Sequence, residues 1–277
     1  MATKSKLWSR ILIYIVMTVC ALFVVFPFIW MFSVSLKTLT EYNFRPIKLF
    51  NFTLTWENYK NAFVNMNILK YALNSVYVSV FVCVLQIVTS VCAAFAFALL
   101  EFRGKKLMFG TVMATMMMPT SIMLVPLYLV VKNLGFSNTY AAMILPFGFT
   151  GFGIFLLRQY FLSLPRDLKQ AAEIDGAGYF RILWQIYFPL AMPGVMSLTI
   201  IAFIGIFNSI LWPQVSISSD NLMVMPVRML SMVSFDRTLN PPSILSFAAV
   251  CVVLPVIVFV SLQKFFVKGY VLSGIKG

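Results

Sequence analysis

The side chains that could do chemistry in this chain are uncharged and polar, and they lie within very apolar stretches. Candidates for contact with a solute are Asn74, Thr120, Ser121, Asn208, Ser209 and Trp212, with Ser75, Gln86 and Gln214 beside them. Amides offer donors and acceptors to hydroxyl groups, and an aromatic face can stack on C–H groups. The same residue types also form interhelical hydrogen bonds or interfacial anchors. The sequence favours that second role for Ser75 and Gln86 and leaves both roles open for Asn208 and Trp212.

Most catalytic and redox chemistry is excluded. The chain has no histidine and no G-x-x-x-x-G-K-[ST] phosphate-binding motif. Its four cysteines, Cys20, Cys83, Cys92 and Cys251, lie in apolar runs without paired spacing, which is typical of packing residues. We therefore expect no catalytic residue, no metal site and no cofactor bound by this chain, and we do not expect an enzyme.

Composition indicates a membrane protein. Of 277 residues, 61% are hydrophobic and 10% charged, and the mean hydropathy is +0.93. Six charge-free runs each exceed the roughly 20 residues that a membrane-spanning helix needs: Ile11–Leu36, Tyr71–Leu100, Leu107–Val131, Asn133–Leu157, Ile182–Ser219 and Thr238–Gln263. We expect an all-α polytopic membrane protein with six transmembrane helices, near residues 11–36, 71–100, 107–131, 138–158, 193–217 and 243–263.

Prolines and glycines mark places where these spans should depart from a straight helix. Pro119, Pro126 and Pro255 lie inside spans, where they are expected to bend the helices. Gly148, Gly151 and Gly153 form a cluster without a lysine, which favours close helix packing or a kink over phosphate binding.

Basic residues predict the orientation. Segments 1–10, 101–106, 158–181 and 264–277 hold 13 Lys or Arg, against 8 in the alternate segments 37–70, 132–140 and 220–237. The positive-inside rule therefore places both termini and the loop 159–192 in the cytoplasm. These loop charges account for the net charge of +13 without a nucleic-acid partner. The first apolar run is too long for a cleaved signal and is expected to be an uncleaved anchor.

The stretch from Leu164 to Pro189 reads as two short amphipathic helices on the cytoplasmic side. The first carries Leu164, Leu168, Ala171, Ala172 and Asp175 at helical spacing, with Pro165 in its first turn and Gly176 just past its end. The second has an apolar stripe of Phe180, Leu183, Trp184, Tyr187 and Phe188, and Pro189 is expected to stop it. Such surface is covered either by the chain's own membrane domain or by a partner.

The spacing within this stretch resembles a known motif. Ala171-Ala172, three residues, Gly176, nine residues, Ile186, one residue and Phe188-Pro189 resemble the EAA loop of ABC importer membrane subunits. Gln170 stands where that family usually has Glu, and Phe188 where it has Leu. In the family this loop is the coupling helix that docks into a groove of the ATPase. The resemblance implies that Gln170, Ala171, Ala172, Asp175, Gly176, Ile186 and Pro189 couple this chain to an ATPase.

Further motifs resemble one class of that family, the shorter six-span carbohydrate permeases of the maltose, oligosaccharide and glycerol-3-phosphate class. They are Ser35–Thr38 with Glu57–Tyr59, Asn74-Ser75, Met118–Thr120 with Pro126–Tyr128 and Leu134–Tyr140, Asn208 with Leu211–Pro213, and Phe265–Gly269 with Lys276-Gly277. Phe207 and Ser209 depart from the Trp and Asp common beside Asn208 in the family.

The resemblance implies a type I importer fold. A single permease domain would span 11–263 and include the loop 159–192, with cytoplasmic ends 1–10 and 264–277. It implies a second EAA-type permease, two P-loop ATPase subunits that hold ATP and Mg²⁺, and an extracytoplasmic solute-binding protein that contacts segment 220–243. The expected location is a bacterial cytoplasmic membrane, and the expected substrate is a sugar or oligosaccharide.

Two other functions stay open, an ion-coupled secondary transporter and a membrane scaffold that transports nothing. The six long apolar runs contain no Asp, Glu, Lys or Arg. Ion-coupled transporters usually place such groups at mid-membrane despite the cost. Their absence counts against ion coupling and favours energy supplied from outside the membrane domain.

Overall fold

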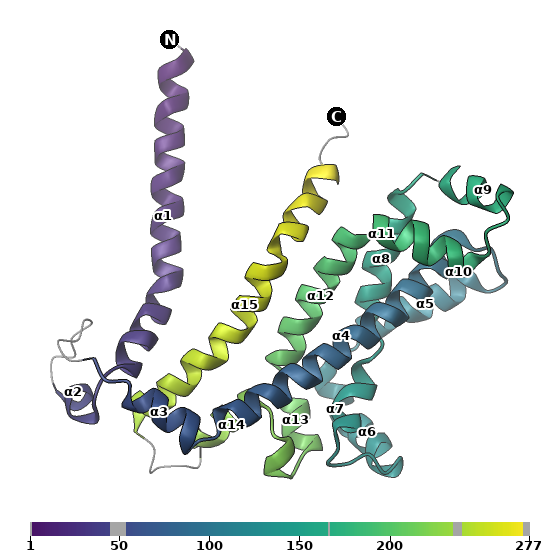
Figure 1. Ribbon diagram of the computed structural model, residues 1–277. Coiled ribbons are helices and arrows are strands. Elements are labelled where there is room, and N and C mark those ends of the chain that lie inside the picture. Colours follow the sequence, from purple (N-terminus) through teal and green to yellow (C-terminus); the bar gives the residue numbers. More distant parts are fainter. Residues whose placement is uncertain (1, 45–53, 166, 235–239, 274–277) are drawn as a thin grey trace. The chain divides into compact units, whose positions relative to one another are not determined.

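The computed structural model describes residues 2–44, 54–165, 167–234 and 240–273, and this part of the chain contains helices and no strands. The expected all-α polytopic fold is confirmed (Figure 1). The chain divides into two compact units, residues 1–69 with 229–252 and residues 70–228 with 253–277. The predicted motif residues Lys276 and Gly277, and positions 235–239 of the expected external segment, lie outside the described residues.

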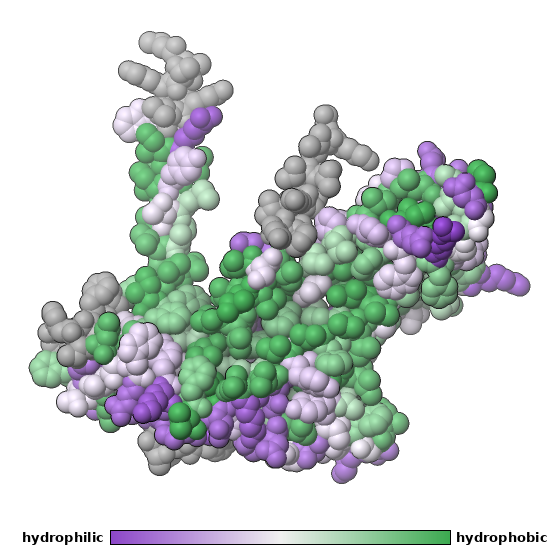
Figure 2. Space-filling model, viewed as in Figure 1, coloured by the Kyte–Doolittle hydropathy of each residue, from purple (hydrophilic) through white to green (hydrophobic). Residues whose placement is uncertain are grey.

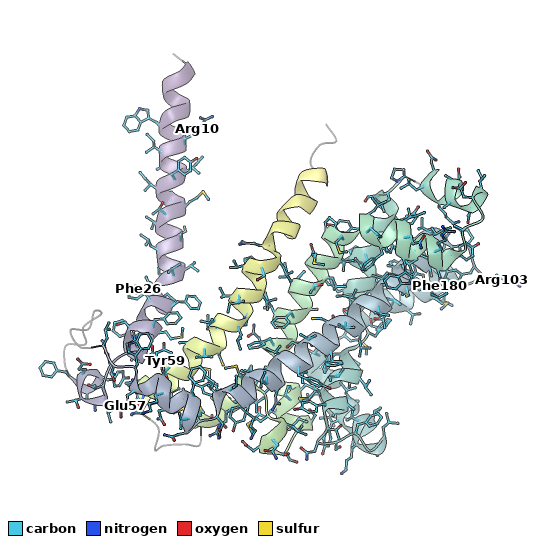
Figure 3. All side chains as sticks on the ribbon, viewed as in Figure 1. Arg10, Phe26, Glu57, Tyr59, Arg103 and Phe180 are labelled. Carbon is cyan, nitrogen blue, oxygen red and sulfur yellow. The ribbon has the colours of Figure 1, made fainter. Side chains whose placement is uncertain are left out.

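The first unit contains one long helix, which is followed by short helices. Helix α1 (Ala2–Ser35) includes a membrane-length stretch, Trp8–Ser35, whose most apolar window is not buried by the protein. Arg10 and Phe26 project from α1 in Figure 3. Helix α2 (Leu39–Asn43) begins with a capping box between Thr38 and Glu41, and α3 (Glu57–Val64) follows. The unit is completed by the end of α14 (Met225–Ser234) and the first part of α15 (Pro241–Ser273).

The second unit holds the remaining helices. Its first helix, α4, is long enough to cross a membrane, and shorter helices pack around it. The elements are α4 (Ile68–Leu99), α5 (Lys105–Met116), α6 (Thr120–Asn133), α7 (Tyr140–Ile144), η1 (Leu145–Phe147), α8 (Gly151–Ser163), α9 (Asp167–Ile174), α10 (Tyr179–Ile182), η2 (Leu183–Tyr187), α11 (Phe188–Leu190), α12 (Met192–Phe207), α13 (Leu211–Ser216) and η3 (Asp220–Leu222). In Figure 1, α9 and α10 lie at one end of this unit and α6, α7 and α13 at the other.

The stretch expected to form the third span does not form one straight helix. Helices α5 and α6 meet at an angle of 104° across the break at residues 117–119. Pro119 is the residue before α6, where its missing N–H costs no helical hydrogen bond. The expected bend at Pro119 is thus a complete break, whereas Pro126 and Pro255 lie inside uninterrupted helices.

The glycine cluster serves both close packing and a bend, as expected. A Cβ on Gly153 would lie 2.5 Å from Ser90 Oγ on α4, and one on Gly151 would lie 2.8 Å from Met116 Cγ on α5. The chain bends by 42° between the α7–η1 segment and α8, at the residues that follow Gly148. Close approach of α8 to α4 and α5 therefore requires glycine at these positions.

The number of membrane spans depends on whether each pair of helices joined at a bend is counted as one span. Three helices, Trp8–Ser35, Ile68–Leu99 and Pro241–Gln263, are long and apolar enough to cross a membrane alone, and the described residues reach six spans if each of three bent pairs counts as one. The fifth expected span, 193–217, ends earlier than predicted, because α12 stops at Phe207 with Asn208 as its C-terminal cap and the separate helix α13 follows. On the face shown in Figure 2, apolar residues predominate over α1, α12 and the described part of α15, as a lipid-facing surface requires.

Candidate functional site

The predicted helix–turn–helix forms at the end of the second unit. Helix α9 begins at Asp167, while Leu164 caps the end of α8 and Pro165 precedes α9. The prediction that these two residues belong to the first helix is therefore wrong. Gly176 confirms the predicted turn, because its φ of 74° is left-handed. The Gly176 N–H bonds Glu173 O at 3.1 Å and the Ala177 N–H bonds Ala172 O at 2.9 Å. These two bonds form a Schellman motif, which ends α9.

The second helix differs from the prediction at Pro189. The chain forms a π-helical turn over Leu183–Tyr187, in which the Phe188 N–H donates to Leu183 O. Pro189 then lies inside the short helix α11, and the chain turns at Ala191 instead. A proline ring clashes with the carbonyl four residues earlier in a regular α-helix, and the wider π turn is a recognised way to relieve that conflict.

One face of this helix pair packs against the chain's own membrane helices. Ala172, Ile182, Leu183 and Tyr187 are buried in a core cluster with residues of α4, α8 and α12. The Tyr187 ring meets those of Phe95 and Phe161 edge-on, with ring centroids 5.7 and 5.8 Å apart. The helix pair is therefore in direct contact with three helices of the second unit.

The opposite face is apolar and exposed. Ile174 is 86% exposed and Phe180 77%, and Leu168, Tyr179 and Trp184 are exposed beside them. Figure 3 shows Phe180 at the same end of the unit as Arg103. The predicted stripe is thus divided: Leu183 and Tyr187 point inward, whereas Phe180 and Trp184 do not. Ile182, which the stripe omitted, takes an inner position.

The predicted coupling residues occupy both faces. Gln170, Ala171, Asp175, Gly176 and Pro189 are exposed, Ala172 is buried and Ile186 is half-buried. Lys169 and Glu173 form an ion pair of 3.2 Å along α9, and the Lys169 ammonium lies 5.9 Å from the centre of the Tyr179 ring. Two of the charged groups near the exposed apolar residues, Lys169 and Glu173, are therefore paired with each other within the loop.

Four of the polar residues proposed for a solute route are occupied by structural hydrogen bonds. Asn74 donates to Asn221 O and Met223 O at 2.8 and 2.9 Å and accepts from the Tyr140 hydroxyl at 2.7 Å. Three other side chains are buried and bond backbone groups, namely Ser75 with Met225 N, Gln86 with Phe147 O, and Trp212 with Ala142 O. These bonds are of the interhelical kind that the sequence left open.

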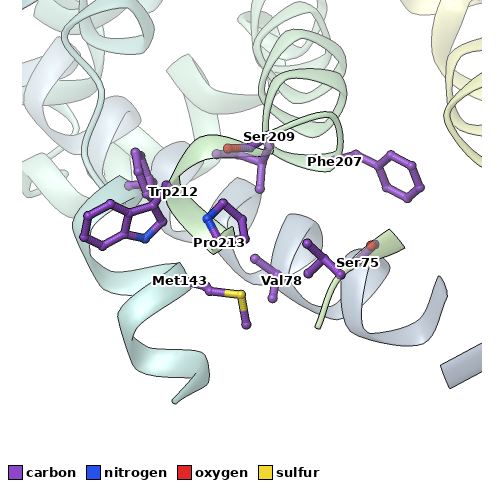
Figure 4. Close-up of a pocket in the computed structure, with 10 residues that line it drawn as sticks. Ser75, Val78, Met143, Phe207, Ser209, Trp212 and Pro213 are labelled. Atoms are coloured by element: carbon purple, nitrogen blue, oxygen red, sulfur yellow. The ribbon is translucent and has the colours of Figure 1, made fainter. Parts of the chain in front are cut away.

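The remaining candidates are accessible. Thr120, Ser121, Asn208 and Gln214 are exposed, and Ser209 is half-buried. Ser209 lines a small cavity with Ser75 and Trp212, which Figure 4 shows between α4, α7 and α13. That cavity has room for about one water molecule, so the structure brings these predicted residues together without leaving space for a sugar.

Comparison with known proteins identifies the family. Residues 86–271 match the family described as binding-protein-dependent transport system inner membrane component. The chain is also 30% identical over 261 residues to the arabinooligosaccharides transport system permease protein AraQ of Halalkalibacterium halodurans, covering 93% of each chain. The chain belongs to this family of ABC importer permeases.

Further comparisons agree with this permease assignment over nearly the whole length. The permease is 30% identical over 271 residues to the sn-glycerol-3-phosphate transport system permease protein UgpE of Rhizobium meliloti, covering 95% of this chain and 96% of that one. Its fold matches a bacterial ABC transporter involved in the import of the acidic polysaccharide alginate, with a TM-score of 0.84, 22% identity, and coverage of 95% and 98%.

At the other end of the second unit, the permease has an ion pair and a hydrogen bond between η3 and α4 that the sequence did not predict. Asp220 of η3 forms an ion pair with Lys70 and accepts a hydrogen bond from the Tyr71 hydroxyl at 2.8 Å. The hydrogen bond from Lys70 holds the pKa of the Asp220 carboxyl below its usual range, and the bond from Tyr71 acts in the same direction. Residues 150 positions apart cannot be paired from sequence spacing alone.

Proposed function

We propose that this chain is one of two permease subunits of an importer that carries a sugar or oligosaccharide across the cytoplasmic membrane. The relatives that cover almost its whole length are permeases for arabinooligosaccharides and for sn-glycerol-3-phosphate, both hydroxylated solutes. The observation that carries the proposal is the two-sided loop, which packs on the membrane helices with one face and exposes Ile174 and Phe180 on the other.

The exposed face of the loop is the docking surface for an ATPase subunit. Large apolar side chains that protrude into water gain free energy when a partner covers them, about 1.5–3 kcal/mol for each that is fully buried. ATP and Mg²⁺ belong to that partner, because this chain has no phosphate-binding loop. Closure of two ATPase subunits would move the loop, and the core around Tyr187 would transmit the movement to α4, α8 and α12.

The substrate route in this proposal is lined by the accessible candidates Thr120, Ser121, Asn208 and Ser209. The second permease completes the route, and a solute-binding protein delivers the substrate on the outer side. The small cavity beside Ser209 would have to widen for passage, which is consistent with a route that opens to one side at a time.

Copurification with variants of the exposed face tests the proposal. The wild-type permease should copurify with a P-loop ATPase. The amount of ATPase that copurifies with the double variant Ile174→Ser, Phe180→Ser should be at least tenfold lower, because each lost apolar contact corresponds to about a factor of ten in affinity. Leu134→Ser is the matched control, since Leu134 is 61% exposed at the end of α6.

Energy dependence supplies the second measurement. Sugar uptake by reconstituted vesicles should stop when ATP is depleted while an ion gradient persists. Uptake that continues under those conditions would establish ion coupling instead. Equal ATPase recovery by wild type and the double variant would remove the docking role of the exposed face.

A further inference from the structure

The first unit contains an open cleft of about 900 Å³ that the roles above do not use. It lies between α3, the turn that follows α1, and the first turn of α15. Ligand pockets in proteins typically measure about 300–1,000 Å³, so this cleft is near the upper end of that range. Segment 37–70, which supplies most of its lining, alternates with the cytoplasmic segments and is extracytoplasmic in the proposed orientation.

The walls of the cleft are held together by buried hydrogen bonds. Asn58 is 8% exposed, and its Nδ2 donates to Ser35 O at 2.9 Å and to Lys37 O at 2.7 Å. Its Oδ1 accepts from Ser243 Oγ at 3.1 Å, and its backbone carbonyl accepts from Ser246 Oγ at the same distance. One residue of α3 thereby fixes both the turn after α1 and the start of α15, so the cleft is pre-formed.

An exposed aromatic side chain stands on the cleft wall. Trp56 is 67% exposed and lines the cleft. Its ring centroid lies 5.6 Å from that of Tyr59, whose hydroxyl is 2.7 Å from Ser35 Oγ. Figure 3 labels Tyr59 and Glu57 on α3. Because Tyr59 is anchored in this way, it supports Trp56 on one side while most of the Trp56 surface faces solvent.

The rest of the lining combines amide groups with balanced charge. Asn65 Nδ2 donates to Asn61 Oδ1 at 2.6 Å, which leaves the Nδ2 of Asn61 and the Oδ1 of Asn65 without a partner among the described residues. Lys60 and Glu57 also line the cleft, and the described residues offer neither of them an ion-pair partner. The lining therefore presents donors and acceptors together with one positive and one negative charge.

We propose that this cleft is an extracytoplasmic subsite for two or more rings of an uncharged oligosaccharide, an assignment that rests on the proposed sugar import. Amide groups match sugar hydroxyls, and the Trp56 face matches the C–H face of a sugar ring. The volume suits a chain better than a single ring. The balanced pair of Lys60 and Glu57 gives no preference for an acidic glycan.

Direct binding to the purified transporter, without the binding protein and without ATP, tests the subsite. The probes are maltotriose, arabinotriose, glucose and a trisaccharide of galacturonic acid, measured by saturation-transfer NMR and equilibrium titration. At least one uncharged trisaccharide should bind, more tightly than glucose and the acidic trisaccharide. Trp56→Ala should weaken that binding about tenfold, and Trp56→Phe should restore part of it, since stacking requires only an aromatic face.

Phe63→Ala is the matched control, because Phe63 is a 51% exposed aromatic residue on the same helix and does not line the cleft. It should bind as wild type does, and each variant should still copurify with the ATPase. Equal binding by wild type and Trp56→Ala, or no trisaccharide binding by a transporter that retains its ATPase, would overturn the subsite and leave the import function standing. Preference for the acidic trisaccharide would overturn its uncharged ligand class.

Discussion

Gly176 is the residue on which the turn between the two loop helices depends. Its φ of 74° is a conformation that β-branched residues almost never adopt, although a side chain there would meet no neighbouring atom within 4 Å. Any effect of a substitution must therefore come from the backbone. The Schellman hydrogen bonds at the end of α9 require this conformation.

We predict that Gly176→Val inserts into the membrane normally but loses ATP-driven uptake, because about 1–2 kcal/mol of backbone strain shifts the turn. Uptake and ATPase activity of the reconstituted transporter are the measurements. Gly178→Val is the control, since Gly178 has an extended backbone, with φ of −72°, and also has open space around it. Normal uptake by Gly176→Val would contradict a role for the turn in coupling.

The sequence predicts best the residues whose structural role is local. The turn at Gly176 was predicted because turn chemistry depends on a few neighbouring positions, whereas the fifth span was expected to reach residue 217 and its helix ends at Phe207. The sequence could not decide whether Asn74 and Trp212 face a solute or a neighbouring helix. Their partners, Tyr140 and Ala142, come from distant segments that only the folded chain brings near.

At the level of elements, the sequence predicted where helices are apolar but not how proline would be accommodated. The expected third span breaks completely at Pro119, whereas Pro126 is tolerated inside α6. Pro189 does not stop its helix, because a π-helical turn precedes it. Each outcome depends on the packing around the proline, which local sequence does not specify.

The interactions of Asp220 in η3 with Lys70 and Tyr71 in α4 give a prediction with a pH dependence. Because the folded-state pKa of Asp220 lies below its usual value of about 3.9, its contribution to stability is complete above about pH 4 and is lost as the pH falls through the lowered pKa. Asp220→Asn should therefore loosen η3 at pH 7 as acid does in the wild type. The pair is partly exposed, so hydrogen exchange in residues 217–224 should rise only about two- to fivefold.

Asp175→Asn serves as the control for that experiment, because Asp175 is exposed at the opposite end of the second unit. It should leave exchange in residues 217–224 unchanged. A change in the wild-type protection factor of residues 217–224 between pH 5 and pH 8, where Asp220 stays ionised, would show that another group controls the segment.

For the whole molecule, the orientation in the membrane is the property that loop charges predict. In a cysteine-free background, a membrane-impermeant maleimide should label Leu134→Cys in intact cells and label Ser163→Cys only after the membrane is opened. Both side chains are exposed, and the loops after α6 and α8 lie on opposite sides in the proposed topology. The reverse labelling pattern would place the coupling loop outside and exclude an ATPase partner for it.

The division of the loop helices into an inner and an outer face has a consequence for how subunits are exchanged between transporters. Positions 168, 174, 179, 180 and 184 are exposed and are not among the buried residues of the core cluster, so we expect their side chains to tolerate changes that suit a different ATPase with little effect on the membrane helices. Positions 182, 183 and 187 tolerate only replacements of similar volume. Replacing the residues at the five outer positions with those of another permease should therefore transfer that permease's preference for its own ATPase. The choice of solute should stay unchanged.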